Sequence, residues 1–155
     1  MRTQLSILIH FNSLHDILKY FSLFLLVEEL KLLLAFGTDV DTTDENGCTA
    51  LHRAVESGAN ECMEILVQNK CNVDARDVDL MTPLMYAALN GQPRVMRNLL
   101  EKNVHLDAKD KDGWNALHWA AKMADRETCK LLVGKYYVNK TKTSVWLITL
   151  GNILI

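Results

Sequence analysis

Residues 82–87 read Thr82-Pro83-Leu84-Met85-Tyr86-Ala87, and this hexapeptide decides the fold because versions of it recur at a fixed interval. Thr49-Ala50-Leu51-His52-Arg53-Ala54 lies 33 residues before it, and Asn115-Ala116-Leu117-His118-Trp119-Ala120 lies 33 residues after it. Self-similarity at a constant period is the signature of a protein built from stacked repeats. The sequence therefore predicts a repeat architecture.

The same interval of 33 residues holds on both sides of the hexapeptides. It aligns three aspartates before them and three leucines after them, with no insertion or deletion. The aligned residues are Asp44, Asp77 and Asp110, followed by Leu66, Leu99 and Leu132. We therefore predict three copies of one structural unit, at residues 44–76, 77–109 and 110–133.

Within one copy, local signals predict a turn followed by two short helices. Asp44-Glu45-Asn46-Gly47 and Asp110-Lys111-Asp112-Gly113 are turn sequences in which glycine can adopt a positive φ. Thr49 and Thr82 are suited to cap a helix N-terminus, and Pro83 suits the first helical position. Apolar spacing then predicts first helices at about 50–57, 84–90 and 116–123, and second helices at about 61–68, 94–101 and 126–133.

This turn–helix–helix unit resembles the ankyrin repeat, whose Thr-Pro-Leu-His-x-Ala signature the three hexapeptides follow. The resemblance implies an all-α fold: an ankyrin-repeat solenoid of stacked helix-turn-helix units with protruding hairpin-like loops. A partial copy at residues 27–43 supplies a second helix and its exit loop. The array is therefore expected to cover residues 27–133.

Some residues depart from the family pattern in and beside the middle repeat. Leu80 stands where the other two turns have glycine, and Lys70 and Asn103 replace the glycine after a second helix. Asparagine tolerates the left-handed conformation needed at such a helix end better than lysine does. We expect the fold to form with a less stable middle repeat, which proteases cut at the Leu80 turn first.

The 33-residue register fails at both ends of the chain, which are rich in apolar residues. We expect an irregular N-terminal segment at residues 1–26 and a C-terminal tail at 134–155. Neither end is a normal membrane span, because one is interrupted by polar residues and the other is shorter than the roughly 20 residues required. Irregular caps formed by residues 16–24 and 145–155, and membrane contact by the apolar ends, are both open alternatives. A third is translated intron on both sides of one exon, since Gly134-Lys135-Tyr136 can be encoded by a splice-donor sequence.

No sequence pattern points to catalysis. We find no Walker-type glycine loop, GxSxG or HExxH motif, and therefore predict a non-enzyme without catalytic, cofactor-binding or metal-binding residues. His52 and His118 occupy the histidine position of the signature. The resemblance implies that their imidazoles form hydrogen bonds with the backbone of neighbouring loops.

The charge balance and the cysteines restrict partner and location. The 17 Lys+Arg against 19 Asp+Glu give a formal net charge of −2, which argues against nucleic acid as the main partner. The four cysteines include no CxxC pair and fit apolar positions of the repeat. They therefore favour a reducing, intracellular location in the cytoplasm or nucleus.

The resemblance implies a protein-binding scaffold or adaptor, whose hairpin tips and first helices form a concave surface. The rival expectation is a regulatory or targeting part of a larger enzyme or channel. We expect Arg53, Tyr86 and Trp119 to be half-buried packing residues, and Trp114 either to contact a partner or to cover the adjacent loop. The candidate partner-binding residues are the variable positions of the tips and first helices, with Met81, Leu89, Trp114 and Met123 as apolar side chains left open: Glu45, Asn46, Cys48, Glu56, Arg76, Val78, Asp79, Met81, Leu89, Asn90, Lys109, Lys111, Asp112, Trp114, Lys122 and Met123.

Overall fold

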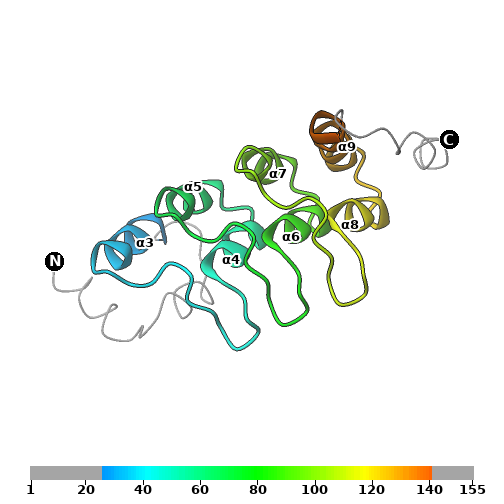
Figure 1. Cartoon of the computed structure of the whole chain (residues 1–155). Coiled ribbons are helices and arrows are strands. Elements are labelled where there is room, and N and C mark those ends of the chain that lie inside the picture. Colours follow the sequence, from blue (N-terminus) through cyan, green and yellow to red (C-terminus); the bar gives the residue numbers. More distant parts are fainter. Residues whose placement is uncertain (1–25, 141–155) are drawn as a thin grey trace.

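Helices in two rows make up the part of the chain that the computed structural model describes, which is the backbone of residues 26–140 and the side chains of 27–136 (Figure 1). Three hairpin loops extend from the first row on the side away from the second (Figure 1). The first row holds α4 (Ala50–Glu56), α6 (Pro83–Leu89) and α8 (Ala116–Lys122). The second row holds α3 (Leu26–Ala35), α5 (Asn60–Gln68), α7 (Pro93–Leu100) and α9 (Arg126–Lys140). The all-helical fold with recurring helix pairs confirms the sequence prediction.

One continuous apolar core runs between the rows. Leu51 and Leu84 from the first row and Leu66, Leu99 and Leu132 from the second are at most 1% exposed. Burying each of these side chains stabilises the fold by about 1.5–3 kcal/mol. Each helix of a row packs on the next one of that row, so each repeat buries part of its neighbour.

The residues that replace family glycines keep the glycine backbone. Leu80 has φ 61°, Lys70 φ 62° and Asn103 φ 57°, all in the left-handed region, as does Gly47 with φ 72°. Left-handed backbone costs a residue with a Cβ atom roughly 1–2 kcal/mol. The sequence analysis missed a fourth case, Ala124 with φ 54° at the end of α8, although its 33-residue register with Gly91 could have revealed it.

The last helix of the array is longer than predicted. We expected the last helix to end at Val133 and a tail outside the repeat pattern to begin at residue 134, but α9 continues to Lys140. Gly134 does not have a positive φ and lies within the helix. Tyr136 explains the extension, since its hydroxyl donates a hydrogen bond to the carbonyl oxygen of Leu106 and so ties this turn of α9 to the preceding exit loop.

At the N-terminal end, α3 agrees with the second helix predicted for the partial copy. The segment predicted at 1–26 lies outside the described residues except for its last residue. The caps predicted at 16–24 and 145–155 lie wholly outside them. Between residues 26 and 140, no helix is both long enough and apolar enough to cross a membrane.

Candidate protein-binding surface

Each hairpin is organised by the aspartate that begins its repeat. One carboxylate oxygen of Asp77 accepts hydrogen bonds from the backbone N–H groups of Asp79 and Met81, both at 2.9 Å. Asp44 and Asp110 bind the equivalent two N–H groups of their own hairpins at 2.8–3.0 Å. The aspartates therefore satisfy backbone donors of an irregular loop, which would otherwise need water.

The second carboxylate oxygen of each aspartate binds a side chain nine residues further on, in the first helix. The donor is a guanidinium in Arg53 (2.6 Å to Asp44), a phenol in Tyr86 (2.9 Å to Asp77) and an indole in Trp119 (2.8 Å to Asp110). These three residues are half-buried, as predicted, but their shared partner was not predicted. The 33-residue alignment does place each aspartate and its donor at equivalent positions. The shared contact could not be recognised there, because Arg, Tyr and Trp have only an N–H or O–H group in common.

Neighbouring hairpins are joined through their backbones. The N–H of Val78 donates to the carbonyl oxygen of Asn46, and the N–H of Lys111 donates to that of Asp79, both at 3.0 Å. A Cβ atom on Gly47 would lie 3.0 Å from the nitrogen of Val78, so glycine permits this close approach as well as its positive φ. Because of these bonds, the three tips form one connected row.

His52 fulfils the role that the resemblance implied. Its Nε2 lies 3.2 Å from the carbonyl oxygen of Met81 in the next hairpin, and its Nδ1 lies 3.1 Å from the backbone nitrogen of Thr49. Nδ1 therefore accepts and Nε2 donates, which is the neutral form of the ring. Burial lowers the pKa of His52, and this outweighs the hydrogen bond with Met81 and the charge of Asp77, which raise it.

His118 differs from that expectation. It is exposed, and its Nδ1 lies 2.6 Å from Oδ1 of Asn115 and 3.2 Å from the backbone nitrogen of the same residue. These contacts are within its own repeat. The reason is its position in α8, the last first-row helix described, where no following hairpin lies over the imidazole as the Met81 hairpin lies over His52.

Most of the predicted binding residues are exposed along the tips and the ends of the first helices. Val78 and Met123 are 52% and 49% exposed, and Leu80, which was not predicted, is 40% exposed. Met81, Leu89 and Trp114 are half-buried rather than open. The other exposed members of the predicted set are Glu45, Asn46, Glu56, Arg76, Asp79, Asn90, Lys109, Lys111, Asp112 and Lys122.

Cys48 was wrongly assigned to this surface. The structure buries it to 3% exposure, with its Sγ 3.6 Å from the Tyr86 hydroxyl and 4.0 Å from Asp77 Oδ2. Burial raises the pKa of the Cys48 thiol above its usual range. Cys48 therefore forms a contact between repeats although it lies in a turn, because the following hairpin packs on it.

Arg76 also serves the framework as well as the surface. Its Nε donates to the carbonyl oxygen of Leu80 at 3.2 Å, and an Nη2–H donates to that of Lys109. Both acceptors are backbone groups, one in its own hairpin and one at the start of the next. Arg76 is therefore exposed but held in place.

Trp114 lies in a cluster at the last hairpin. Its ring centroid is 5.1 Å from that of Trp119 and 6.2 Å from that of His118. The Lys122 Nζ lies 5.0 Å from the Trp114 centroid and 4.7 Å from the Trp119 centroid, which is cation–π distance. Trp114 thus packs on side chains of its own repeat and is half-buried.

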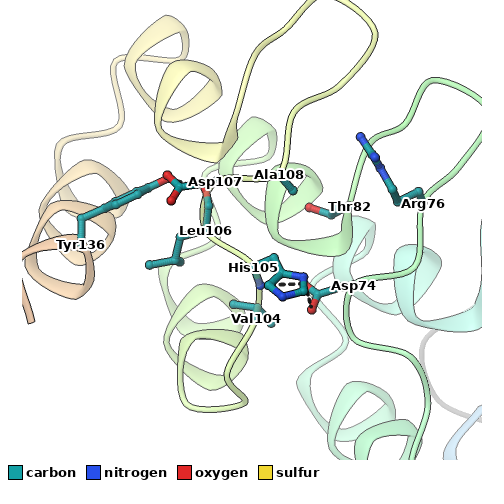
Figure 2. Close-up of a pocket in the computed structure, with 9 residues that line it drawn as sticks. All are labelled: Asp74, Arg76, Thr82, Val104, His105, Leu106, Asp107, Ala108 and Tyr136. Carbon is teal, nitrogen blue, oxygen red and sulfur yellow. Dashed lines mark hydrogen bonds and ion pairs between the residues drawn. The ribbon is translucent and has the colours of Figure 1, made fainter. Parts of the chain in front are cut away.

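A hollow of about 470 Å³ lies away from the hairpin tips, between two exit loops and α9 (Figure 2). Asp74 holds His105 at its wall by accepting the His105 backbone N–H at 2.8 Å, and its other oxygen lies 3.4 Å from Nδ1. The His105 side chain is 82% exposed. Tyr136 points toward Asp107 on the opposite side (Figure 2). Asp74 orients loop backbone, and Thr82 in the same wall accepts the N–H of Met85, so both polar groups already serve the packing of the repeats.

Comparison with known families agrees with this architecture. A family model described as ankyrin repeats (3 copies) matches residues 14–110 and again residues 76–144. The chain belongs to the ankyrin repeat family. No curated protein matches the chain.

Ankyrin repeats are generally protein–protein interaction modules, and their domains are typically non-catalytic. The residues that the structure describes contain no group of three or more His, Cys, Asp or Glu side chains placed to hold a metal ion. All four cysteines of this ankyrin array are free thiols, with Cys48, Cys62 and Cys71 buried and Cys129 half-buried. Burial raises the pKa of the Cys71 thiol to about 12, so it is an inert core residue.

Proposed function

We propose that this ankyrin array is a scaffold or adaptor that binds another protein through its hairpin tips and the exposed ends of α4, α6 and α8. One observation carries the proposal: the aspartate that holds each hairpin is repeated in all three units, whereas the exposed positions beside it differ. Asp44, Asp77 and Asp110 all bind their hairpins in one way. The neighbouring positions 45, 78 and 111 are Glu, Val and Lys, which no folding requirement explains.

Exposed apolar side chains on the tips support the same conclusion. Val78 and Leu80 lie on one hairpin with about half of each side chain in water. Large apolar and aromatic residues are favoured anchors in protein interfaces. The rival prediction, an array that regulates or targets an attached enzyme or channel, would use this same surface.

Trp114→Ala tests the proposal. We expect it to weaken capture of a partner from a lysate at least 10-fold, while the far-ultraviolet circular dichroism stays unchanged because Trp114 is only half-buried. The matched control is Glu64→Ala on the second row, which is exposed and should leave capture unaffected. If Trp114→Ala unfolds the array, this residue is structural and the surface assignment fails.

Location is the second part of the proposal. The array is inferred to work in a reducing compartment, the cytoplasm or nucleus, because its thiols occupy core positions rather than cross-linking loops. Fluorescence microscopy of the tagged full chain, with brefeldin A to block secretion, tests this. Signal that shifts to the endoplasmic reticulum on treatment would contradict it.

A further inference from the structure

Two sets of equivalent surface positions change character in the same order along the stack. On the first helices the set is Glu56, Leu89 and Lys122, and at the hairpin tips it is Glu45, Val78 and Lys111. Both sets therefore read acidic, apolar and basic from the first repeat to the third. All six are exposed except Leu89, which is half-buried. Because both sets change in the same order, the two ends of the surface differ in charge.

At each end of this surface, one charged residue is paired with another side chain and one is not. Exposed Glu56 pairs with the half-buried Arg53 at 2.8 Å, and exposed Lys111 pairs with exposed Asp79 at 3.2 Å. Exposed pairs of this kind are worth about 0–1 kcal/mol, so a partner can exchange them at little cost. Glu45 and Lys122 make no ion pair with any other side chain of residues 27–136.

Lys122 is positioned by aromatic rings and not by a carboxylate of residues 27–136. Its ammonium lies over the rings of Trp114 and Trp119, which are neutral, and Trp119 is itself anchored to Asp110. A positioned side chain loses less conformational entropy when it binds than a mobile one does. Lys122 is therefore prepared to donate its N–H groups to a carboxylate.

The middle of the surface lacks charge at these positions and offers apolar contact. Val78 is 52% exposed and Leu80 is 40% exposed at the second hairpin. Leu89, which occupies the register position of Lys122 in the second repeat, lies at the end of α6 and is not part of the apolar core. Along these two registers, a segment that crosses all three repeats would meet an acidic, then an apolar, then a basic side chain, with Asp79 already paired to Lys111.

We propose that this surface binds a bipolar segment of a partner protein, and the proposal rests on the proposed function. A basic side chain of the segment pairs with Glu45 and Glu56, apolar side chains cover Val78 and Leu89, and a carboxylate binds Lys122 beside the two indoles. A polyanion such as nucleic acid fits less well, because the first repeat would repel it.

The packing of the helices sets the spacing of the two charges in that segment. Neighbouring packed helices lie about 8–10 Å apart, so α4 and α8 are separated by roughly 16–20 Å. An extended chain rises about 3.3 Å per residue and spans this in about five or six residues. A helical segment, with about 1.5 Å per residue, needs about eleven to thirteen.

Selection from a phage-displayed library of random 16-residue peptides against the immobilised full chain tests the proposal. Four versions are compared: the unchanged chain, Lys122→Glu, the double variant Glu45→Lys/Glu56→Lys, and the control Lys130→Glu. Lys130 is an exposed lysine of α9, in the second row. Circular dichroism confirms that each version is folded before selection.

We expect the unchanged chain to enrich peptides that carry a basic and an acidic residue, separated by one of the two spacings, with apolar residues between. Lys122→Glu should lower the enrichment of acidic residues at least fivefold, and the double variant should do the same for basic residues. Lys130→Glu should change neither. The spacing found then tells whether the segment binds extended or helical.

Acidic residues that stay enriched on Lys122→Glu, or are lost equally on Lys130→Glu, would overturn the proposal, as would a library from which nothing is enriched. Photo-cross-linking of the selected peptides to a photoreactive residue at position 90 or 64 separates failure of this proposal from failure of the proposed function. Position 90 is exposed at the end of α6, on the proposed binding surface. Peptides without a charge pattern that cross-link to position 90 overturn only the charge order. Peptides that cross-link to position 64 on the second row, and not to position 90, overturn the binding surface itself.

Discussion

The second and third repeats share a framework but bury it to different extents. Leu84, Met85 and Ala88 on α6 are at most 1% exposed. Their equivalents on α8 are Leu117, which is half-buried, and His118 and Ala121, which are exposed. α6 lies between α4 and α8, whereas α8 has one neighbour in its row within the described residues (Figure 1). Burial in this protein is therefore a property of position in the stack as much as of the residue.

That difference implies that stability comes chiefly from the contacts between repeats. In a stacked array, each unit contributes a small intrinsic stability and a larger nearest-neighbour term. Substitutions at equivalent positions of the two repeats should therefore have unequal effects. Urea unfolding followed by circular dichroism at 222 nm measures each pair.

The largest expected contrast is between two equivalent leucines. Leu84→Ala should lower the free energy of unfolding by about 2–5 kcal/mol, because it leaves a cavity between three helices. Leu117→Ala should cost less than about half as much, since its side chain is only partly removed from water. Equal losses would show that α8 is covered as completely as α6.

The hairpin aspartates give the next contrast. Asp77→Ala removes the acceptor of two backbone N–H groups and of the Tyr86 hydroxyl, and we expect a loss of about 2–4 kcal/mol from these unpaired donors. Asp110→Ala should cost about 1–2 kcal/mol, because its hairpin is bonded to one described neighbour rather than two. Once Asp77→Ala has removed the acceptor, adding Tyr86→Phe should change the free energy of unfolding very little. If Tyr86→Phe costs as much in the Asp77→Ala protein as in the unchanged chain, the two residues do not act through their hydrogen bond.

The buried histidine of the first repeat, His52, predicts a dependence of stability on pH. Burial lowers the pKa of His52 in the folded state, so the unfolded state binds the proton first as pH falls. The contribution of His52 to the free energy of unfolding is therefore complete well above the unfolded pKa of about 6.5 and is lost as pH falls below that value. The slope should be at most about 1.4 kcal/mol per pH unit between pH 7 and 5. His52→Met, which copies the second repeat, should remove this slope.

The turn residues give the smallest effect and the one opposite in sign. Leu80→Gly should stabilise the protein by about 0.5–1 kcal/mol, because φ is 61° at this position and glycine adopts it without strain. Gly113→Ala, at φ 80° in the third hairpin, should destabilise it by a similar amount. Limited proteolysis at the second turn should also slow in Leu80→Gly. Faster cutting at Gly47 or Gly113 in the unchanged chain would contradict a weaker middle repeat.

The repeat period and the helices were predictable because their signals are local. Turn glycines, the predicted cap Thr82 and the leucine spacing act within a few residues, and three copies reinforce one another. The helix starts at Ala50, Ala116 and Arg126 agree with the prediction, and those at 60, 83 and 93 lie one residue earlier. The end of α9 was missed because its anchor, Tyr136, acts on a loop 30 residues away.

The binding surface was predicted less completely than the fold. The tips and first helices could be chosen from the resemblance, and most chosen residues are exposed. Cys48 was misplaced since an adjacent hairpin covers it, and Leu80 was overlooked because it was considered only as a glycine replacement. The position of Lys122 over two indoles depends on side chains whose mutual orientation has no sequence pattern.

The amino-acid sequence by itself determined the length of the unit, the number of full copies and the order acidic, apolar, basic along two surface registers. Those properties depend only on residue identity and on spacing along the chain, and both can be read from the sequence. The tertiary structure alone decided which equivalent residues are buried, which donor each aspartate binds and where the last helix ends. Each of these depends on atoms from a neighbouring repeat, and the close approach of residues about 30 positions apart exists only once the repeats have stacked.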